Sequence, residues 1–354
     1  MRSSGARRRL PAVAVPCPEE AFDSWLWRAA YRIGVAPGFF ARALGLDLSG
    51  VRQVRPVGFG VCLSLEAAER LEACTGIPAG RFTGMQLANV AVVGAPVGKL
   101  TVSRLREWQA DQWVSVYGGR VCPLCVADVP VSRLWWRLSA AAVCPVHRCL
   151  LVDECAGCGR RVQSGRAQLG MLPVREGALD PGVCGNVLAG SAMGRCEARL
   201  SDLPVTVVGD ILVVWQRPLL EAFAGRPVRA LGDEVSPRQW FAGVRLVTEL
   251  VREAATAAEL EDLGMPSSGR GPGAWLCSVA GEVRGRVGSP PASALEAAFV
   301  LRTAGSLLTG HDPQDAAGRL RSWADRLVRS GAAKTVLAPN RRDVPRLVAA
   351  AVGW

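Results

Sequence analysis

Apolar residues near the start of the chain recur at every third or fourth position, which is the spacing of a helix and not of a strand. They predict one apolar helical face formed by Phe22, Trp25, Leu26, Ala29 and Ile33. Proline and acidic residues precede this helix, and Gly34 ends it. The charged residues are expected mostly off this face: Glu19, Glu20, Asp23, Arg28 and Arg32.

The stretch 64–87 predicts two short helices joined by a turn. Ser64 caps a helix that runs to about Cys74, Gly76 lies in the turn, and Pro78 begins the second helix. A helix, a glycine turn and a second helix form the shape of a helix-turn-helix, which binds DNA through its second helix. That helix would present only Arg81 and Thr83 to base edges. A structural or protein-binding hairpin is the alternative.

The pattern after residue 203 is again helical. An apolar run at 206–224 predicts a packed helix, and Ser236, Pro237 and Gln239 form a helix start with a capping box. Two more helices are expected at 292–308 and 313–329, the second capped by Asp312, and a short one at 343–354. The fold class is therefore mainly α.

These elements predict four segments. Residues 1–15 form a disordered tail, and 16–120 form an N-terminal helical domain with the helix-turn-helix-like hairpin. Residues 121–202 form a double zinc-binding domain, which should hold the few short β-hairpins. Residues 203–354 form a C-terminal helical domain with a flexible loop, rich in glycine, proline and serine, at 264–291.

The segment 121–162 holds six of the twelve cysteines and one of the two histidines. Cys122 and Cys125 are separated by two residues, as are Cys144 and His147. A two-residue gap lets one turn deliver two ligands to the same ion, and tetrahedral zinc takes four such ligands. The spacing predicts one zinc site of three cysteines and one histidine.

A second zinc site is expected from the knuckle at Cys155 and Cys158. Its other ligands would be Cys184 and Cys196, which a hairpin between them could bring to one metal. Cys149 is the rival ligand, but it lies between the pairs on an apolar segment, RCLLV, which favours a buried thiol instead. Four protein ligands close each site, so two structural zinc ions and no catalytic metal are expected.

Other signs of catalysis are missing from the sequence. His311 is the only other histidine, and we expect it to be an exposed neighbour of a helix cap. No phosphate-binding loop or nucleophile elbow is present. Trp135 and Trp136, between the two knuckles of the first site, allow either base stacking or packing over those knuckles.

The formal net charge of +11 suits an acidic partner such as nucleic acid, although the arginine excess over two lysines also fits compositional bias. No signal peptide and no membrane-spanning apolar run is recognised in the sequence. We therefore expect a cytoplasmic protein, in a compartment where clustered cysteines indicate metal rather than disulfides.

Two stretches resemble TniQ family proteins. The opening VPCPEEAFDSWLWRAA is similar to the start of that family, and CPLC…WWR…CPVHRCLLVDECAGCG is similar to its cysteine signature. The resemblance is specific over residues 15–200 and general in layout beyond. It implies the zinc ligands named above, although the eleven residues between Cys184 and Cys196 depart from the tighter family spacing.

The resemblance implies a non-catalytic adaptor in transposition by Tn7-like and related elements. Such an adaptor selects the target by linking target DNA or a targeting complex to an AAA+ ATPase, which in turn recruits the transposase. The resemblance is also compatible with a homodimer. A free-standing zinc-containing helix-turn-helix regulator is the alternative, and a zinc-dependent hydrolase or nuclease would need an open metal site that the sequence does not show.

Overall fold

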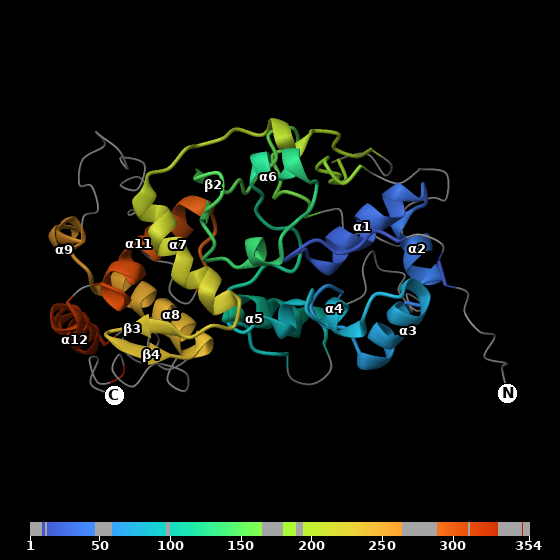
Figure 1. The fold of residues 1–354 in the computed structure, drawn as a ribbon. Coiled ribbons are helices and arrows are strands. Elements are labelled where there is room, and N and C mark those ends of the chain that lie inside the picture. Colours follow the sequence, from blue (N-terminus) through green and yellow to red (C-terminus); the bar gives the residue numbers. More distant parts are fainter. Residues whose placement is uncertain are drawn as a thin grey trace.

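The structure is a computed structural model that confirms a mainly α-helical fold. The ranges that it describes are 9–10, 13–46, 59–96, 100–164, 180–188, 194–263, 289–310, 312–331 and 349. The loop expected at 264–291, the terminal helix expected at 343–354 and His311 lie wholly or almost wholly outside these residues. N-terminal helices form one end of the molecule, the cysteine-rich block the middle, and the C-terminal helices the other end (Figure 1).

In the described part of the N-terminal end there are four helices: α1 (Phe22–Arg32), α2 (Pro37–Ala43), α3 (Leu65–Thr75) and α4 (Ala79–Thr83). The expected apolar face of α1 is buried except for Ile33, which is 45% exposed. Ile33 lies just past the last turn, where the chain leaves the helix through Gly34 at φ +70°. Arg28 was expected off the buried face, but it is buried too, because an ion pair with Glu20 compensates its charge.

The α3–α4 hairpin has the expected cap and turn. The Ser64 side chain accepts a hydrogen bond from the Ala67 N–H, and Gly76 ends α3 in the left-handed conformation. The second helix, however, is a single turn of five residues, and Pro78 is its N-cap rather than its first residue.

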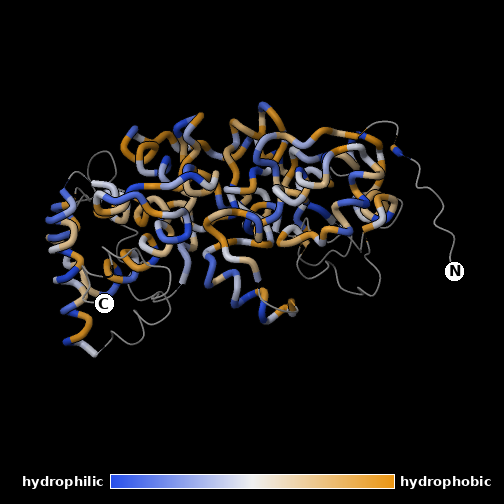
Figure 2. Tube along the Cα trace, turned by 60° about the horizontal axis from the view of Figure 1, so that its bottom comes forward, coloured by the Kyte–Doolittle hydropathy of each residue, from blue (hydrophilic) through white to orange (hydrophobic). Residues whose placement is uncertain are grey.

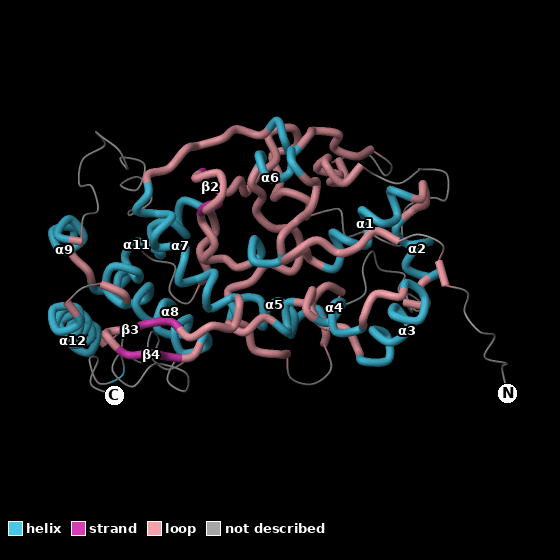
Figure 3. Tube along the Cα trace, viewed as in Figure 1, coloured by secondary structure: helices cyan, strands magenta, loops and turns pink. Residues whose placement is uncertain are grey.

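The described residues of the cysteine-rich middle have little regular structure, as the loops in Figure 3 show. Its main chain is organised instead around the cysteines. Its elements, with those leading into it, are η1 (Leu87–Asn89), α5 (Val102–Gln112), α6 (Pro123–Asp128), η2 (Leu134–Arg137), the antiparallel pair β1 (Val143–Cys144) and β2 (Cys149–Leu150), and η3 (Leu200–Asp202).

Helix α8 lies at the centre of the C-terminal end and contacts α7, α11 and α12. The elements are α7 (Asp210–Phe223), β3 (Val228–Ala230), β4 (Asp233–Val235), α8 (Pro237–Ala254), α9 (Ala257–Asp262), α11 (Ala294–Leu308) and α12 (Pro313–Ser330). Ser236 and Gln239 form the predicted capping box, and Asp312 caps α12 as predicted.

One β-hairpin, β3–β4, lies outside the cysteine-rich block, where no hairpin was expected. Leu231 and Gly232 form its two-residue turn, and both have positive φ. Two positive φ angles are the mark of a type I′ turn, which usually carries Asn-Gly or Asp-Gly. The sequence Leu-Gly does not predict such a turn.

Two buried cores hold the described residues together. The first joins residues from 14 to 85, around Trp25, Phe40 and Phe82. The second runs chiefly from Leu87 to Leu327, and it packs the cysteine block and the C-terminal helices together. The domain limits expected at 120 and 202 fall within this second core, so that division remains a prediction.

Short hydrophobic and hydrophilic stretches are interspersed along most of the chain trace, as Figure 2 shows. Among the residues that the structure describes, no helix has the length and apolar character needed to cross a membrane.

Candidate metal centres

The first cluster consists of Cys122, Cys125, Cys144 and His147, which two small elements bring together. Their donor atoms all lie within 4.8 Å of one another. Cys122 is the N-cap of α6 and Cys125 lies in that helix, whereas Cys144 ends β1 and His147 lies in the turn before β2. The three cysteines are buried, which removes their sulfur atoms from solvent.

The spacing of these donor atoms fits a tetrahedral zinc ion. Zinc–sulfur distances of about 2.3 Å and zinc–nitrogen distances of about 2.0–2.1 Å require sulfurs about 3.8 Å apart and sulfur–nitrogen pairs about 3.6 Å apart. His147 Nδ1 lies 3.5, 3.2 and 3.7 Å from the sulfurs of Cys122, Cys125 and Cys144. The sulfurs of Cys125 and Cys144 are 3.6 Å apart, far beyond a disulfide bond.

His147 is oriented as a metal-binding histidine usually is. Its Nδ1 faces the three sulfurs, and its Nε2 lies 3.4 Å from a carboxylate oxygen of Asp128, at the end of α6. A carboxylate on the second nitrogen fixes the tautomer that leaves the first nitrogen free for metal. The sequence analysis missed Asp128, because no spacing rule identifies such a partner.

Cys149 lies at the first cluster and not at the second. Its sulfur is 3.6 Å from that of Cys122, and its side chain is fully buried. Its consideration as a rival ligand for the second site is therefore wrong, since the β1–β2 register places Cys149 opposite Cys144. The expected burial of Cys149 is confirmed.

The second cluster consists of Cys155, Cys158, Cys184 and Cys196, whose sulfurs also lie within 4.8 Å of one another. The segments 183–188 and 194–199 pair in antiparallel fashion, with bridges Val183–Arg199 and Val187–Arg195. This ladder is the hairpin that the long gap between the last two cysteines required. Sulfur–sulfur distances are 3.7 Å for Cys155–Cys196 and 3.9 Å for Cys158–Cys184, close to a zinc tetrahedron.

Gly157 and Asn186 support the second cluster. A Cβ at Gly157 would lie 2.7 Å from Ala198 Cβ and 3.3 Å from the Cys196 sulfur, so only glycine fits between the knuckle and the hairpin. The buried Asn186 amide donates to the Cys158 sulfur at 3.5 Å and to the Arg161 carbonyl at 2.9 Å. Neither residue was singled out from the sequence.

The thiols of each cluster compete for their protons. Hydrogen bonds from Cys125 and Cys144 lower the pKa of Cys122, and the same sharing raises the pKa of Cys125. Burial raises the pKa of Cys184 to about 12. All the ligands of a bound zinc ion must be deprotonated, so a divalent cation is the partner that lets these thiols ionise together.

Trp135 and Trp136 pack inside the protein. They are 3% and 1% exposed and belong to the core that contains the first-cluster cysteines. The Trp135 Nε1 donates to Glu19 at 3.1 Å. Buried indoles cannot stack on bases, so the packing interpretation is confirmed.

The motif at the start of α1 fastens the N-terminal end to the cysteine block. The Glu20 carboxylate is 2.6 Å from the Arg28 guanidinium, and both side chains are buried. Asp23 pairs with Arg137 at 2.5 Å, and the Ser132 N–H donates to the Ser24 hydroxyl at 2.8 Å. The acid, serine and arginine of this motif therefore have structural roles that periodicity alone did not reveal.

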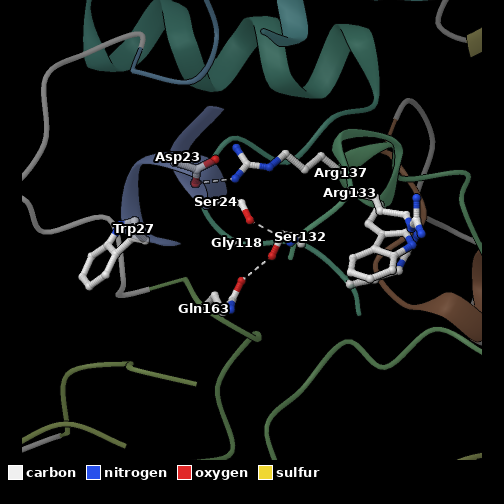
Figure 4. Close-up of a pocket in the computed structure, with 11 residues that line it drawn as sticks. Asp23, Ser24, Trp27, Gly118, Ser132, Arg133, Arg137 and Gln163 are labelled. Atoms are coloured by element: carbon white, nitrogen blue, oxygen red, sulfur yellow. Dashed lines mark hydrogen bonds and ion pairs between the residues drawn. The ribbon is translucent and has the colours of Figure 1, made fainter. Parts of the chain in front are cut away.

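Figure 4 shows the recess where these contacts meet, with Asp23 facing Arg137 and Ser132 between Ser24 and Gln163. The recess has a volume of about 20 Å³, which is room for about one water molecule. It is too small for a nucleotide or a metabolite, so it does not form a substrate pocket.

A second buried contact joins the block to the C-terminal helices. Arg120 is 2.6 Å from Asp153, whose other oxygen accepts the Ala294 N–H at the start of α11 at 2.5 Å. The buried Gln216 of α7 accepts N–H groups of Ala142 and Val143 at 3.0 and 3.2 Å. The cysteine block therefore lies between two helical groups that it holds in place.

The two residues suggested for DNA contact lie on α4. Arg81 is exposed and donates to the Pro16 carbonyl at 3.4 Å, and the partly buried Thr83 hydroxyl donates to Gly80 at 3.0 Å. Both side chains thus make contacts within the N-terminal end. DNA binding by these residues remains a prediction.

Comparison with known proteins gave one family. Residues 11–151 match the family model described as TniQ. The match spans α1 to β2 and includes the first cluster, and it ends before the second. The search of curated proteins and the search of solved structures gave no match.

Proposed function

We propose, from the match of residues 11–151 to the TniQ family model, that this chain is a TniQ family protein and a non-catalytic adaptor of DNA transposition. It would link target DNA or a targeting complex to an AAA+ ATPase, and through that ATPase act on the transposase indirectly. The observation that carries the proposal is the match over the N-terminal helices and the first cluster together. The family is associated with transposition, and the specific partners are our proposal.

Both clusters are proposed to hold structural zinc. The four donors of each cluster have spacings that fit a tetrahedron, and they leave no open position for water or substrate. Zinc supplies folding free energy in such sites. In this chain that energy would order the cysteine block, whose described residues form few helices and strands. The N-terminal and C-terminal helical groups pack against this block.

The net charge supports contact with nucleic acid. Arg28, Arg120, Arg137 and Arg252 are buried, and each is paired with an acid. These pairs contribute no net charge, so the excess of +11 is carried by the other residues. We expect weak DNA binding that falls steeply with salt and shows little sequence preference.

A protein-binding surface is proposed beside the first cluster. Val146 in the β1–β2 turn is 71% exposed, and Val207, which pairs with Cys149 at the edge of β2, is 76% exposed. Ile211 and Val214 on the next helix, α7, are 44% and 43% exposed. Neighbouring exposed aliphatic side chains of this kind are typical of protein-interaction sites.

The second candidate function is a free-standing helix-turn-helix regulator, favoured by the α3–α4 hairpin with its glycine turn. A selection from random DNA separates the two functions. A regulator gives one strong consensus sequence, whereas the adaptor gives none and binds in a salt-sensitive way.

An affinity pull-down from the native host, with and without nuclease, tests the adaptor directly. The proposal expects an AAA+ ATPase or a transposase to be recovered in both conditions. Val207→Glu should reduce that recovery about tenfold or more, and the matched control Val328→Glu, 63% exposed on α12, should not. Recovery of chromosomal proteins alone, and only without nuclease, would favour the regulator.

A further inference from the structure

Five metal-binding donors, not four, gather at the first cluster. The fifth is Cys149, which no part of the proposed ligand set uses. Its sulfur lies 3.6 Å from Cys122, the same distance that separates the sulfurs of Cys125 and Cys144. The side chain is fully buried, so its position is not that of a surface thiol that happens to pass nearby.

The β1–β2 register explains why this thiol is here. Cys144 and Cys149 are opposite each other on the two antiparallel strands. Directly opposed residues project their side chains on the same face of the pair. The pairing of β1 with β2 that places Cys144 at the cluster therefore places Cys149 on the same side.

His147 is held less firmly than the three cysteines. It lies in the turn between the strands, and its side chain is 20% exposed. Its partner Asp128 is 71% exposed, so water competes for the contact that orients the ring. The histidine is therefore the ligand that can leave at the smallest cost.

We infer that Cys149 is a reserve ligand of the first cluster, which takes the place of His147 and converts a set of three cysteines and one histidine into a set of four cysteines. The inference rests on the proposed zinc site. In the exchange the bond from zinc to Nδ1 breaks and a bond from zinc to the Cys149 sulfur forms, and the thiol proton passes to the released imidazole or to water. Because the tightest set of four donors leaves Cys149 out, the sulfur must move inward for this exchange.

The first test uses the full-length chain and the variants His147→Ala, Cys149→Ser and the double variant. Each is purified with zinc, dialysed, and measured for zinc per folded chain. We expect two ions in the wild type and in both single variants, and one in the double variant. X-ray absorption at the zinc edge should show that nitrogen is lost and only sulfur remains in His147→Ala. Loss of one ion in His147→Ala alone would overturn the inference.

A second test does not depend on replacing the histidine. Transfer of zinc to a chelator should be about tenfold faster for one of the two ions in Cys149→Ser, because no reserve thiol holds the ion when His147 dissociates. Cys74→Ser, another buried free cysteine in the N-terminal core, is the matched control and should behave as the wild type does. Equal rates for both variants would contradict the reserve role. A folded wild type that contains no zinc would instead overturn the zinc proposal itself.

Discussion

Replacing Glu20 with glutamine tests whether the family motif at α1 acts as a buried electrostatic anchor. The Glu20 carboxylate accepts four hydrogen bonds, two on each oxygen. Oε2 accepts from the Cys17 N–H at 2.9 Å and from Arg28 Nη2 at 2.6 Å. Oε1 accepts from the Ser24 hydroxyl at 3.2 Å and from Arg28 Nε at 3.0 Å.

A glutamine has one acceptor oxygen and one donor nitrogen, so in either orientation two of these donors lose their acceptor. One of the two belongs to a buried guanidinium. Losing a neutral bond costs about 1 kcal/mol and losing a charged one about 1.5–3 kcal/mol, with the unpaired charge left buried. The expected loss is about 3–5 kcal/mol, the range found when a buried ion pair is broken from one side.

The matched control is Glu66→Gln, the same substitution in an ion pair with Arg70 whose glutamate side chain is 78% exposed. An exposed pair of this kind contributes about 0.5 kcal/mol. Thermal unfolding with excess zinc should show a fall of about 5–10 °C for Glu20→Gln and about 1 °C for the control. Equal shifts in the two variants would refute the anchoring role.

Three further predictions concern other contacts. Gly157→Ala should lower the zinc content by one ion, because its new Cβ would collide with Ala198; metal analysis checks this. Asp128→Asn should weaken zinc binding about tenfold in a chelator competition, since the histidine of the first cluster loses its orienting carboxylate. Arg326 lowers the pKa of Glu259 to about 2. This ion pair therefore contributes its full stability above about pH 4.5 and loses it as the pH falls towards 2. The difference in melting temperature between wild type and Glu259→Gln should shrink over that range.

The Gly157 and Asp128 variants each have a control elsewhere in the chain. Gly318→Ala places a Cβ in open space on α12 and should leave the zinc content unchanged. Asp325→Asn, on the exposed face of the same helix, should leave zinc affinity unchanged. A Gly157→Ala chain with two ions, an Asp128→Asn chain with wild-type affinity, or a Glu259→Gln difference that does not vary with pH would contradict the respective argument.

Local signals in the sequence predicted the helix starts and the grouping of the cysteines. The Ser236 capping box and the Asp312 cap appear where the pattern placed them. The capping-box pattern could also have predicted the break between α8 and α9, where Thr256 and Glu259 form a second capping box. Short-range hydrogen bonding determines all of these features, so a single sequence is enough.

Contacts between distant segments were not predictable in this way. The anchoring of Glu20, the position of Cys149 and the need for Gly157 depend on segments that are brought together only by the complete fold. Arg28 was expected outside the buried face, because a helical pattern does not show that a carboxylate eight residues away will neutralise it. Burial of Cys149 was expected, but its position beside the first cluster was not, since strand register and not sequence distance decides which cluster it lies near.

The most direct test of the account is the zinc content of the folded chain purified without added metal. We predict two zinc ions per chain, and one in Cys155→Ser, because the two clusters share no ligand. Circular dichroism should show that the helical ends persist in the variant. A folded wild-type chain with no zinc would contradict the claim that structural metal holds the cysteine block together.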